Sequence, residues 1–177
     1  MDRFNYWYKR VLTHDFIYKQ LPKNSHEIPK MKKIILKSSF NAVTDDIKNI
    51  VFSYTILKII SNQKPKICLS KKSISSFKLQ KNTPLGSKVT LRKTQKNILL
   101  NLFITIVLSR IQNFPLFKVT QQGVLNIGIS QLLLFPQLTD KFEQIPQGLG
   151  LTITFDNNGI RSNNLKILLS GFQLPVS

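Results

Sequence analysis

Residues 63–92 form a polar and strongly basic stretch that limits what the chain can fold into. The stretch carries Lys71, Lys72, Lys78, Lys81 and Lys88 and contains no acidic residue. Its last part, residues 87–92, alternates polar and apolar side chains as a half-buried strand does. A basic loop with no counter-charge of its own suggests that an anion completes it, although a solvated lysine loop explains the charge equally well.

Small and apolar residues in the same stretch refine this interpretation. Serines, Pro84 and Gly86 would let the backbone approach an anion closely. Phe77 and Leu79 are the apolar side chains that could hold the loop against the rest of the protein, and we expect Phe77 to be that anchor. Phosphate contacts of this kind position a protein on nucleic acid without reading the base sequence.

Length and charge restrict the class of protein. The chain has 177 residues, a formal net charge of +18 and a pI near 10.2. This length suits one domain that buries roughly 70% of the surface its unfolded form exposes. Hydrophobic residues make up 42% of the sequence, which excludes a disordered basic tail. A folded body with this charge predicts a polyanionic partner.

A membrane surface is the less favoured polyanion. Membrane attraction would normally show as a basic amphipathic helix or a lipidation motif, and we identify neither. The longest apolar run, residues 98–108, contains Asn101 and is too short to span a bilayer. Asp2 and Asp15 lie in the N-terminal region, so we expect no signal or transit peptide.

The cysteine and histidine content argues against metal chemistry. Cys68 is the single cysteine, and His14 and His26 are the two histidines. These are too few for a disulfide framework or a Cys/His zinc site. We expect Cys68 to be a small buried side chain.

Catalytic motifs are also missing. Asp45 and Asp46 are adjacent acids, but their position at a helix start is explained by capping and the helix dipole. Residues 86–88 lack the first glycine, the GK[ST] order and the following helix of a phosphate-binding loop, and residues 148–150 precede a strand rather than a helix. We therefore predict that the protein is not an enzyme and needs no cofactor.

Hydrophobic spacing predicts interleaved helices and strands. The predicted helices are 4–20, 44–61, 95–110 and 161–170. The predicted strands are 30–38, 87–92, 124–129 and 151–155, with one further strand possible before the basic loop. This alternation predicts a sheet covered by helices on one face.

Apolar stripes identify the core faces we expect. Helix 44–61, capped by Thr44 or Asp45, has its stripe at Ile47, Ile50, Val51, Tyr54, Leu57 and Ile60; helix 95–110, closed by Pro115, has Leu99, Leu100, Phe103, Ile106 and Val107. The N-terminal helix, ended by Pro22, should pack its aromatic residues on the body. The apolar segment 131–138 should be buried.

Seven segments along the chain match one family pattern in order. They are Ile28-Pro29 with Ile34-Ile35-Leu36, ISNQKP (60–65), KKSISSFK (71–78), PLGSKVTLR (84–92), LFITIVLSRI (102–111), GI…FP (128–136) and GLGLTIT (148–154). Together they resemble ribosomal protein five of the large subunit, the universal 5S-rRNA-binding family. The resemblance covers nearly the whole chain. It departs from the family at residues 36–39, 123–126 and 160–163, and at Gln137, where the family has a glutamate.

The resemblance implies a fold and a place in the ribosome. The implied fold is α+β: a two-layer sandwich with a mostly antiparallel sheet backed by helices on one face and an extended basic loop. Residues 1–177 would form a single ribosomal protein domain, with an N-terminal helix in 1–22 and the basic loop and strands in 63–92. The implied position is the central protuberance of the large subunit. Its partners there would be 5S rRNA or other large-subunit rRNA, P-site tRNA, a protein of the small-subunit head and neighbouring ribosomal proteins.

The resemblance also assigns candidate residues. The rRNA-binding set is Lys33, Lys37, Gln63, Lys64, Thr90 and Arg92. The tRNA-facing loop, 71–81 with the adjacent Asn82, supplies Lys71, Lys72, Ser75, Lys78, Gln80, Lys81 and Asn82. We expect repulsion between its lysines to keep this loop mobile until a phosphate backbone orders it.

Two other functions and several locations stay open. An off-ribosome RNA chaperone or RNA-processing accessory protein could use the same fold, and a peripheral membrane module rests on charge alone. Lys, Asn, Ile and Phe are abundant, as A/T-rich codons would produce. We therefore expect a protein of the mitochondrial matrix encoded in the organelle, with an A/T-rich bacterium or a plastid as the alternative.

Overall fold

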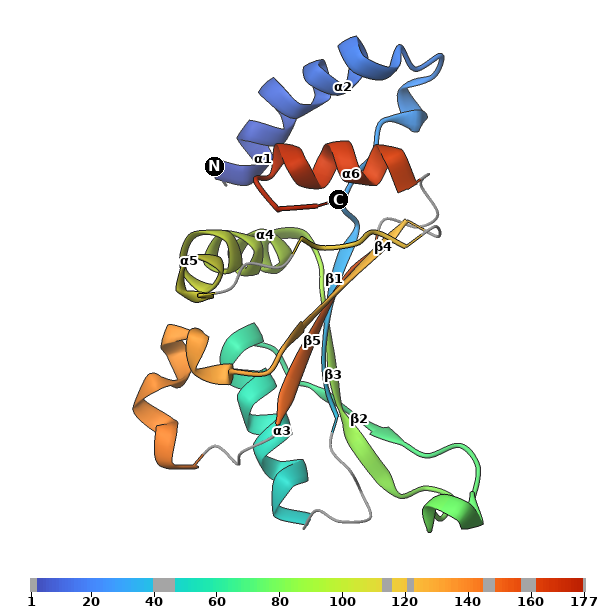
Figure 1. The fold of residues 1–177 in the computed structure, drawn as a ribbon, viewed down its shortest axis with the longest axis vertical. Helices are drawn as coiled ribbons and strands as arrows, with labels where there is room; N and C mark the ends of the chain where they lie inside the picture. The colour runs from blue at the N-terminus through green and yellow to red at the C-terminus, as the bar shows by residue number, and fades with distance from the viewer. Residues whose placement is uncertain are drawn as a thin grey trace. The chain divides into compact units, whose positions relative to one another are not determined.

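A computed structural model describes residues 3–39, 47–112, 116–120, 123–144, 149–156 and 162–176 (Figure 1). Five strands form one open antiparallel sheet in the order β2-β3-β1-β5-β4. Their bounds are β1 Lys33–Ser39, β2 Lys66–Leu69, β3 Pro84–Leu91, β4 Val124–Ile129 and β5 Gly150–Asp156. The predicted α+β class is confirmed.

Helices occupy the regions where the hydrophobic spacing predicted them. They are α1 Arg3–Trp7, α2 Thr13–Gln20, α3 Ile47–Ser61, α4 Lys93–Leu102, α5 Leu108–Arg110 and α6 Ser162–Gly171. Two π-helical turns, Tyr8–Leu12 and Phe103–Val107, join α1 to α2 and α4 to α5. Short 3₁₀ turns are Ser25–Glu27, Ser75–Phe77, Leu132–Leu134 and Pro136–Gln144. Among the described helices, none combines the length and hydrophobicity of a bilayer span.

The chain divides into two compact units. Unit 1 comprises Met1–Ile34, Leu91–Ile127 and Thr154–Ser177, and unit 2 comprises Ile35–Thr90 and Gly128–Ile153. The division falls within β1, β3, β4 and β5, so each unit contains part of each of these strands. We predicted a single domain, and that expectation stays a prediction.

An aromatic pair lies among the mostly aliphatic side chains in the core of unit 1. Phe103 is 1% exposed and its ring centroid lies 6.2 Å from that of Phe155, which is equally buried. Leu99, Leu100 and Val107 are buried with it, as predicted for the stripe of helix 95–110. Ile106 is only partly buried, and Leu108 is buried instead.

The N-terminal helix of unit 1 packs against α6 through one row of side chains. Phe4 and Tyr8 lie beside Phe172, and Leu12 and Phe16 are buried. Trp7, which the predicted stripe also includes, is 44% exposed, although its indole N–H donates to the Gly171 carbonyl. Tyr6 and Tyr18, which lie outside that stripe, are exposed. The helix ends at Leu21, whose left-handed backbone precedes Pro22, as expected.

In unit 2, α3 covers one face of β3. The Ser53 hydroxyl on α3 and the Ser87 hydroxyl on β3 are 3.2 Å apart in a buried hydrogen bond. Ile56, Leu57 and Ile60 complete the buried face of α3. The predicted stripe is wrong at Val51, which is 60% exposed. Thr44, Asp45 and Pro115, expected at helix ends, lie outside the described residues.

Two further predictions for unit 2 concern burial. The expected burial of segment 131–138 is confirmed for Leu132, Phe135 and Leu138 and is wrong for Leu133, which is 37% exposed. Cys68 is only half-buried, because it lies on β2 at the edge of the sheet. The prediction of a fully buried cysteine is therefore wrong.

Candidate nucleic-acid interface

The uncovered face of the sheet in unit 2 carries exposed cations. Along β3, Ser87 and Val89 are buried toward α3, whereas Lys88 and Thr90 are exposed. Along the neighbouring β1, Leu36 and Ser38 are buried and Lys37 is exposed. Since alternate residues of a strand point to opposite faces, Lys37, Lys88 and Thr90 share the face that α3 leaves open.

Strand pairing brings a further lysine to this surface. β2 and β3 are antiparallel, and Lys66 lies directly opposite Lys88. Both side chains are exposed. Cβ atoms of directly opposite residues are about 5 Å apart, and like charges at that spacing destabilise a sheet. An anion between the two ammonium groups would reverse the sign of this interaction.

The turn from α3 into β2 positions Gln63 and Lys64 next to this pair. Asn62 adopts a left-handed backbone with φ 51°, and the Ser61 hydroxyl accepts a hydrogen bond from the Gln63 N–H at 3.2 Å. Lys64 is exposed and Gln63 is partly exposed. Four members of the predicted rRNA-binding set, Lys37, Gln63, Lys64 and Thr90, therefore lie in unit 2.

The other two members of the predicted set lie in unit 1. The Lys33 ammonium is 3.0 Å from a carboxylate oxygen of Asp156, and both side chains are partly buried. Its charge is thus already compensated within the protein. Arg92 is exposed and immediately precedes α4.

The predicted tRNA-facing loop is a hairpin tip with its own hydrogen bonds. Ser70 N–H donates to the Thr83 carbonyl at 2.8 Å, and Ile74 and Leu79 exchange two backbone hydrogen bonds at 3.0 and 3.1 Å. The Ser70 hydroxyl donates to the Gln80 carbonyl and accepts from the N–H of Thr83. Left-handed backbone at Lys78 and Asn82 closes the two bends. The backbone of the loop is therefore held by its own hydrogen bonds, and its mobility without an anion stays a prediction.

All side chains assigned to this tip point into solvent. The exposed set is Lys71, Lys72, Ser75, Lys78, Gln80, Lys81 and Asn82. Phe77 is also 64% exposed, and Ile67, Leu69 and Ile74 are exposed near it. The prediction that Phe77 anchors the loop is therefore wrong. The Ser70 hydrogen bonds hold the tip instead.

Gly86 has a different role from the one we predicted. A Cβ atom at this position would collide with the carbonyl oxygen of Ser38 on β1 and would touch Ser39. Glycine is thus required here because two strands approach each other closely, rather than because an anion approaches the backbone.

Lysines outnumber acidic residues in unit 2, and the four acidic residues of this unit all lie outside residues 47–139. From Ile47 to Thr139 the sequence contains no Asp or Glu. Among the residues whose side chains the structure describes, the lysines of unit 2 make no ion pair. Lys66 and Lys88 were missed as a site because their proximity depends on strand register, although the acid-free run itself was visible in the sequence.

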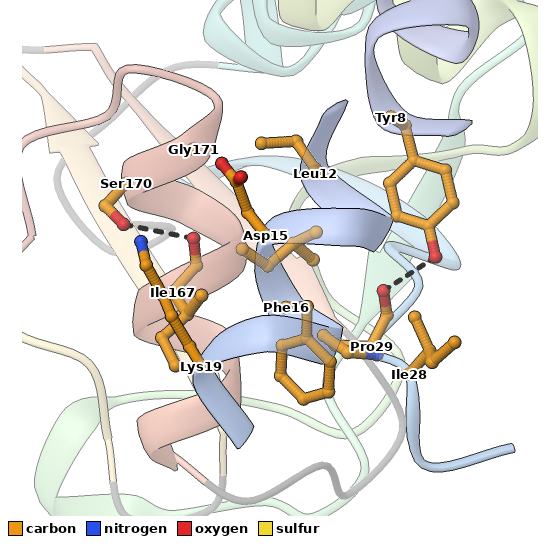
Figure 2. Close-up of a pocket in the computed structure, with 11 residues that line it drawn as sticks. Tyr8, Leu12, Asp15, Phe16, Lys19, Ile28, Pro29, Ile167, Ser170 and Gly171 are labelled. Carbon is orange, nitrogen blue, oxygen red and sulfur yellow. Dashed lines mark hydrogen bonds between the residues drawn. The ribbon is translucent and has the colours of Figure 1, made fainter. Parts of the chain in front are cut away.

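A small cavity in unit 1 is the other candidate site, and Figure 2 shows its lining. It holds about 140 Å³ between α2, α6 and the segment at Pro29. The Tyr8 hydroxyl donates to the Pro29 carbonyl at 3.0 Å, and burial raises the pKa of Tyr8 to about 12. Among the described residues no cluster of His, Cys, Asp or Glu could hold a metal ion. The lining of the cavity is mostly apolar, with Asp15 and Lys19 as its charged members.

Comparison with known proteins gives consistent matches along the chain. The family model described as ribosomal protein L5 matches residues 24–80, and the model for the C-terminus of the same ribosomal family matches residues 84–176. Large ribosomal subunit protein uL5m of Reclinomonas americana is 34% identical over 180 residues, covering 100% of this chain and 99% of its own length. Large ribosomal subunit protein uL5 of Karelsulcia muelleri (strain GWSS) is 33% identical over 176 residues, covering 98% and 94%.

Proposed function

The chain belongs to the ribosomal protein L5 family, and from that premise we propose that its open sheet face in unit 2 binds 5S rRNA, or the rRNA that replaces it, in the central protuberance. Membership itself makes the protein a component of the large ribosomal subunit with a structural rather than a catalytic role. The open sheet face in unit 2 is the proposed contact surface for this rRNA.

The Lys66–Lys88 pair is the observation that carries this proposal. Two exposed lysines directly opposite each other weaken the sheet unless an anion lies between them. Lys37 and Lys64 extend the positive surface on either side of the pair. Phosphates placed along this surface would release counterions, which supplies most of the affinity.

Polar groups on the same surface suit RNA recognition by shape. Thr90 and Gln63 offer a hydroxyl and an amide, which can bond to phosphate, sugar or a 2′-hydroxyl. Lys33 is a weaker member of the set, since Asp156 already neutralises it.

The hairpin tip is our proposed contact with P-site tRNA. Its lysines surround a small, hydrogen-bonded backbone and have no acidic neighbours in sequence. A tip that is already folded loses little conformational entropy when it binds. Contact with a protein of the small-subunit head belongs to the same proposal and rests on family membership alone.

A mitochondrial location is supported by two observations. The composition is rich in Lys, Asn, Ile and Phe, and the relative uL5m is a mitochondrial ribosomal protein. We propose a place in the mitochondrial matrix and a gene held in the organelle, with an A/T-rich bacterium or a plastid as the alternative.

The lysine pair gives a direct test of the sheet face. Replacing Lys66 with Thr should strengthen the isolated protein by roughly 0.2–1 kcal/mol, because it removes a like-charge pair. The same change should weaken binding to 5S or large-subunit rRNA and lower the slope of log affinity against log salt by about one unit. Lys58→Thr, an exposed lysine on α3, is the matched control and should leave the slope unchanged.

A double variant tests the surface on either side of the pair. Lys37→Ala with Lys64→Ala should lower the salt slope by about two units. An unchanged slope in this variant and in Lys66→Thr would exclude the open face as the rRNA site.

The proposed contact between the hairpin tip and P-site tRNA can be tested in ribosomes. Changing Lys71, Lys72, Lys78 and Lys81 to Ser should leave subunit assembly intact and reduce P-site tRNA affinity. Failed assembly with normal tRNA binding in the residual particles would make the tip an rRNA clamp instead. Sedimentation distinguishes a ribosomal protein from an off-ribosome chaperone. Co-migration with large subunits in moderate salt would exclude the chaperone.

A further inference from the structure

The N-terminal helix of unit 1 carries two rows of side chains on opposite sides. The inner row, Phe4, Tyr8, Leu12 and Phe16, packs toward α6. Tyr6, Arg10, His14 and Tyr18 repeat the same four-residue spacing two positions away, and all four are exposed. We call these four residues the outer row.

The π turn Tyr8–Leu12 is what keeps both rows straight. In an uninterrupted α-helix, residues four apart drift by about 40° per step. A π turn takes one extra residue, so it cancels much of this drift in the middle of the helix. The inner row therefore stays on α6 and the outer row stays opposite to it. Among the described elements of unit 1, none is drawn on the side of this helix that faces away from α6 (Figure 1).

The outer row joins aromatic rings to cations. Tyr18 is 82% exposed and Tyr6 is 56% exposed. Arg10 and His14 lie between them, and the exposed side chains of Lys9 and Lys19 flank the row. The one acidic residue of this helix segment, Asp15, lines the cavity beside α6 instead.

Trp7 adds a ring that is already fixed in place. Its indole N–H donates to the Gly171 carbonyl at 3.2 Å. It also lines a shallow hollow of about 90 Å³ with Arg3, Phe4, Phe172 and Gln173. A ring held by its edge keeps its orientation and loses little entropy when a planar group stacks on it.

We propose that the outer row, with Trp7 beside it, binds an unpaired stretch of ribosomal RNA, the tyrosine rings stacking on bases and Arg10 contacting the backbone. Proteins hold single strands with exposed aromatic rings that have cationic side chains beside them. Tyr6 and Tyr18 are about 18 Å apart along the helix, so they stack on different bases.

The charge and the arrangement of apolar residues favour RNA over other occupants. A protein with a net charge of +18 selects a polyanion. A membrane would need the continuous apolar side of the helix, and that side is already packed on α6. An acidic protein surface remains the competing partner, and the experiment distinguishes it.

The test uses the full chain carrying Lys37→Ala and Lys64→Ala, so that binding at the open sheet face is reduced. The probes are a short single-stranded RNA of mixed sequence and the same strand annealed to its complement. Adding Tyr6→Ala and Tyr18→Ala should lower the affinity for the single strand by about fivefold to a hundredfold for each tyrosine ring removed, because the base stacked on that ring loses its contact. The affinity for the duplex should stay unchanged. Phe at both positions should restore binding, whereas Asn5→Ala and Gln20→Ala, on the same exposed helix, should have no effect.

Three results would overturn the proposal. Single-strand affinity could be unaffected by the tyrosine changes, or single-strand and duplex affinity could fall equally, which would leave phosphate contact alone. Alternatively, RNA binding could be normal while the variant fails to enter large subunits, which would make the row a protein contact. Thermal melting checks that the variants fold. The single variant Tyr18→Ala, at the more exposed position, provides a second measurement of single-strand affinity. Fluorescence of Trp7, the single tryptophan, should be quenched by the single strand in the parent protein.

Discussion

Phe103 in unit 1 and Phe77 in unit 2 show how differently the two regions are held together. Phe103 is 1% exposed and packs on Phe155, whereas Phe77 is 64% exposed on a tip whose order comes from backbone hydrogen bonds and the Ser70 hydroxyl. Unit 1 uses its ring for folding. The tip of unit 2 leaves its lysines and Phe77 exposed.

The largest expected effect is at the buried ring. Phe103→Ala should destabilise the protein by roughly 3–5 kcal/mol, because the ring leaves a cavity next to Phe155. Chemical denaturation of the isolated protein measures this loss. Ile98→Ala, an exposed apolar residue on α4, is the matched control and should cost far less. Equal losses in both variants would remove the distinction between the two regions.

The next effect is at a strand crossing in unit 2. Gly86→Ala should cost roughly 1–3 kcal/mol, because the new methyl group meets the Ser38 carbonyl and must push two strands apart. At Gly128 a methyl group would meet nothing, so Gly128→Ala should be neutral or slightly stabilising. Urea titrations of the two variants compare them directly. A stable Gly86→Ala protein would show that unit 2 is loose throughout and not only at its tip.

A smaller effect separates two tyrosines of the N-terminal helix. Tyr8→Phe should cost about 1 kcal/mol by losing the hydrogen bond to Pro29. The control is Tyr18→Phe, at an exposed ring, which should cost nothing.

The same pair predicts a pH dependence. Burial raises the pKa of Tyr8 from 10.0 to about 12, so between these values the unfolded chain loses a proton that the folded protein keeps. The contribution of Tyr8 to the free energy of unfolding is therefore complete below pH 10 and is lost as the pH rises toward 12. Melting temperatures across this range should fall less steeply in Tyr8→Phe than in the parent, with Tyr18→Phe following the parent.

The smallest expected effect on stability is at the tip. Phe77→Ala should change the free energy of unfolding by less than about 0.5 kcal/mol, as for other exposed substitutions. A loss comparable to that of Phe103→Ala would mean that the tip folds with the body, contrary to its exposure.

Sequence reasoning succeeded where burial follows a regular period. Strand 124–129 was predicted at its observed bounds, and helix 95–110 with most of its buried stripe, because Leu99, Leu100, Phe103 and Val107 repeat as one face. The same reasoning failed at Val51, which is exposed. Ser53, a polar residue, is buried on α3 instead, and its hydroxyl is hydrogen-bonded to that of Ser87.

The features that escaped prediction depend on neighbours distant in sequence. Gly86 is explained by the carbonyl of Ser38, and the opposition of Lys66 and Lys88 by strand register. The exposure of Phe77 follows from the small size of the tip, which offers nothing for a ring to pack on. None of these causes is a local pattern.

The π turn Tyr8–Leu12 also makes this helix sensitive to changes in chain length. Deletion of one residue between 8 and 12 would restore an ordinary α-helix and rotate everything before it by about 100° relative to α2. Phe4 would leave its place beside Phe172, and Tyr6 would leave the line of Arg10 and His14. Descendants of this gene should therefore accept few insertions or deletions between Tyr8 and Leu12.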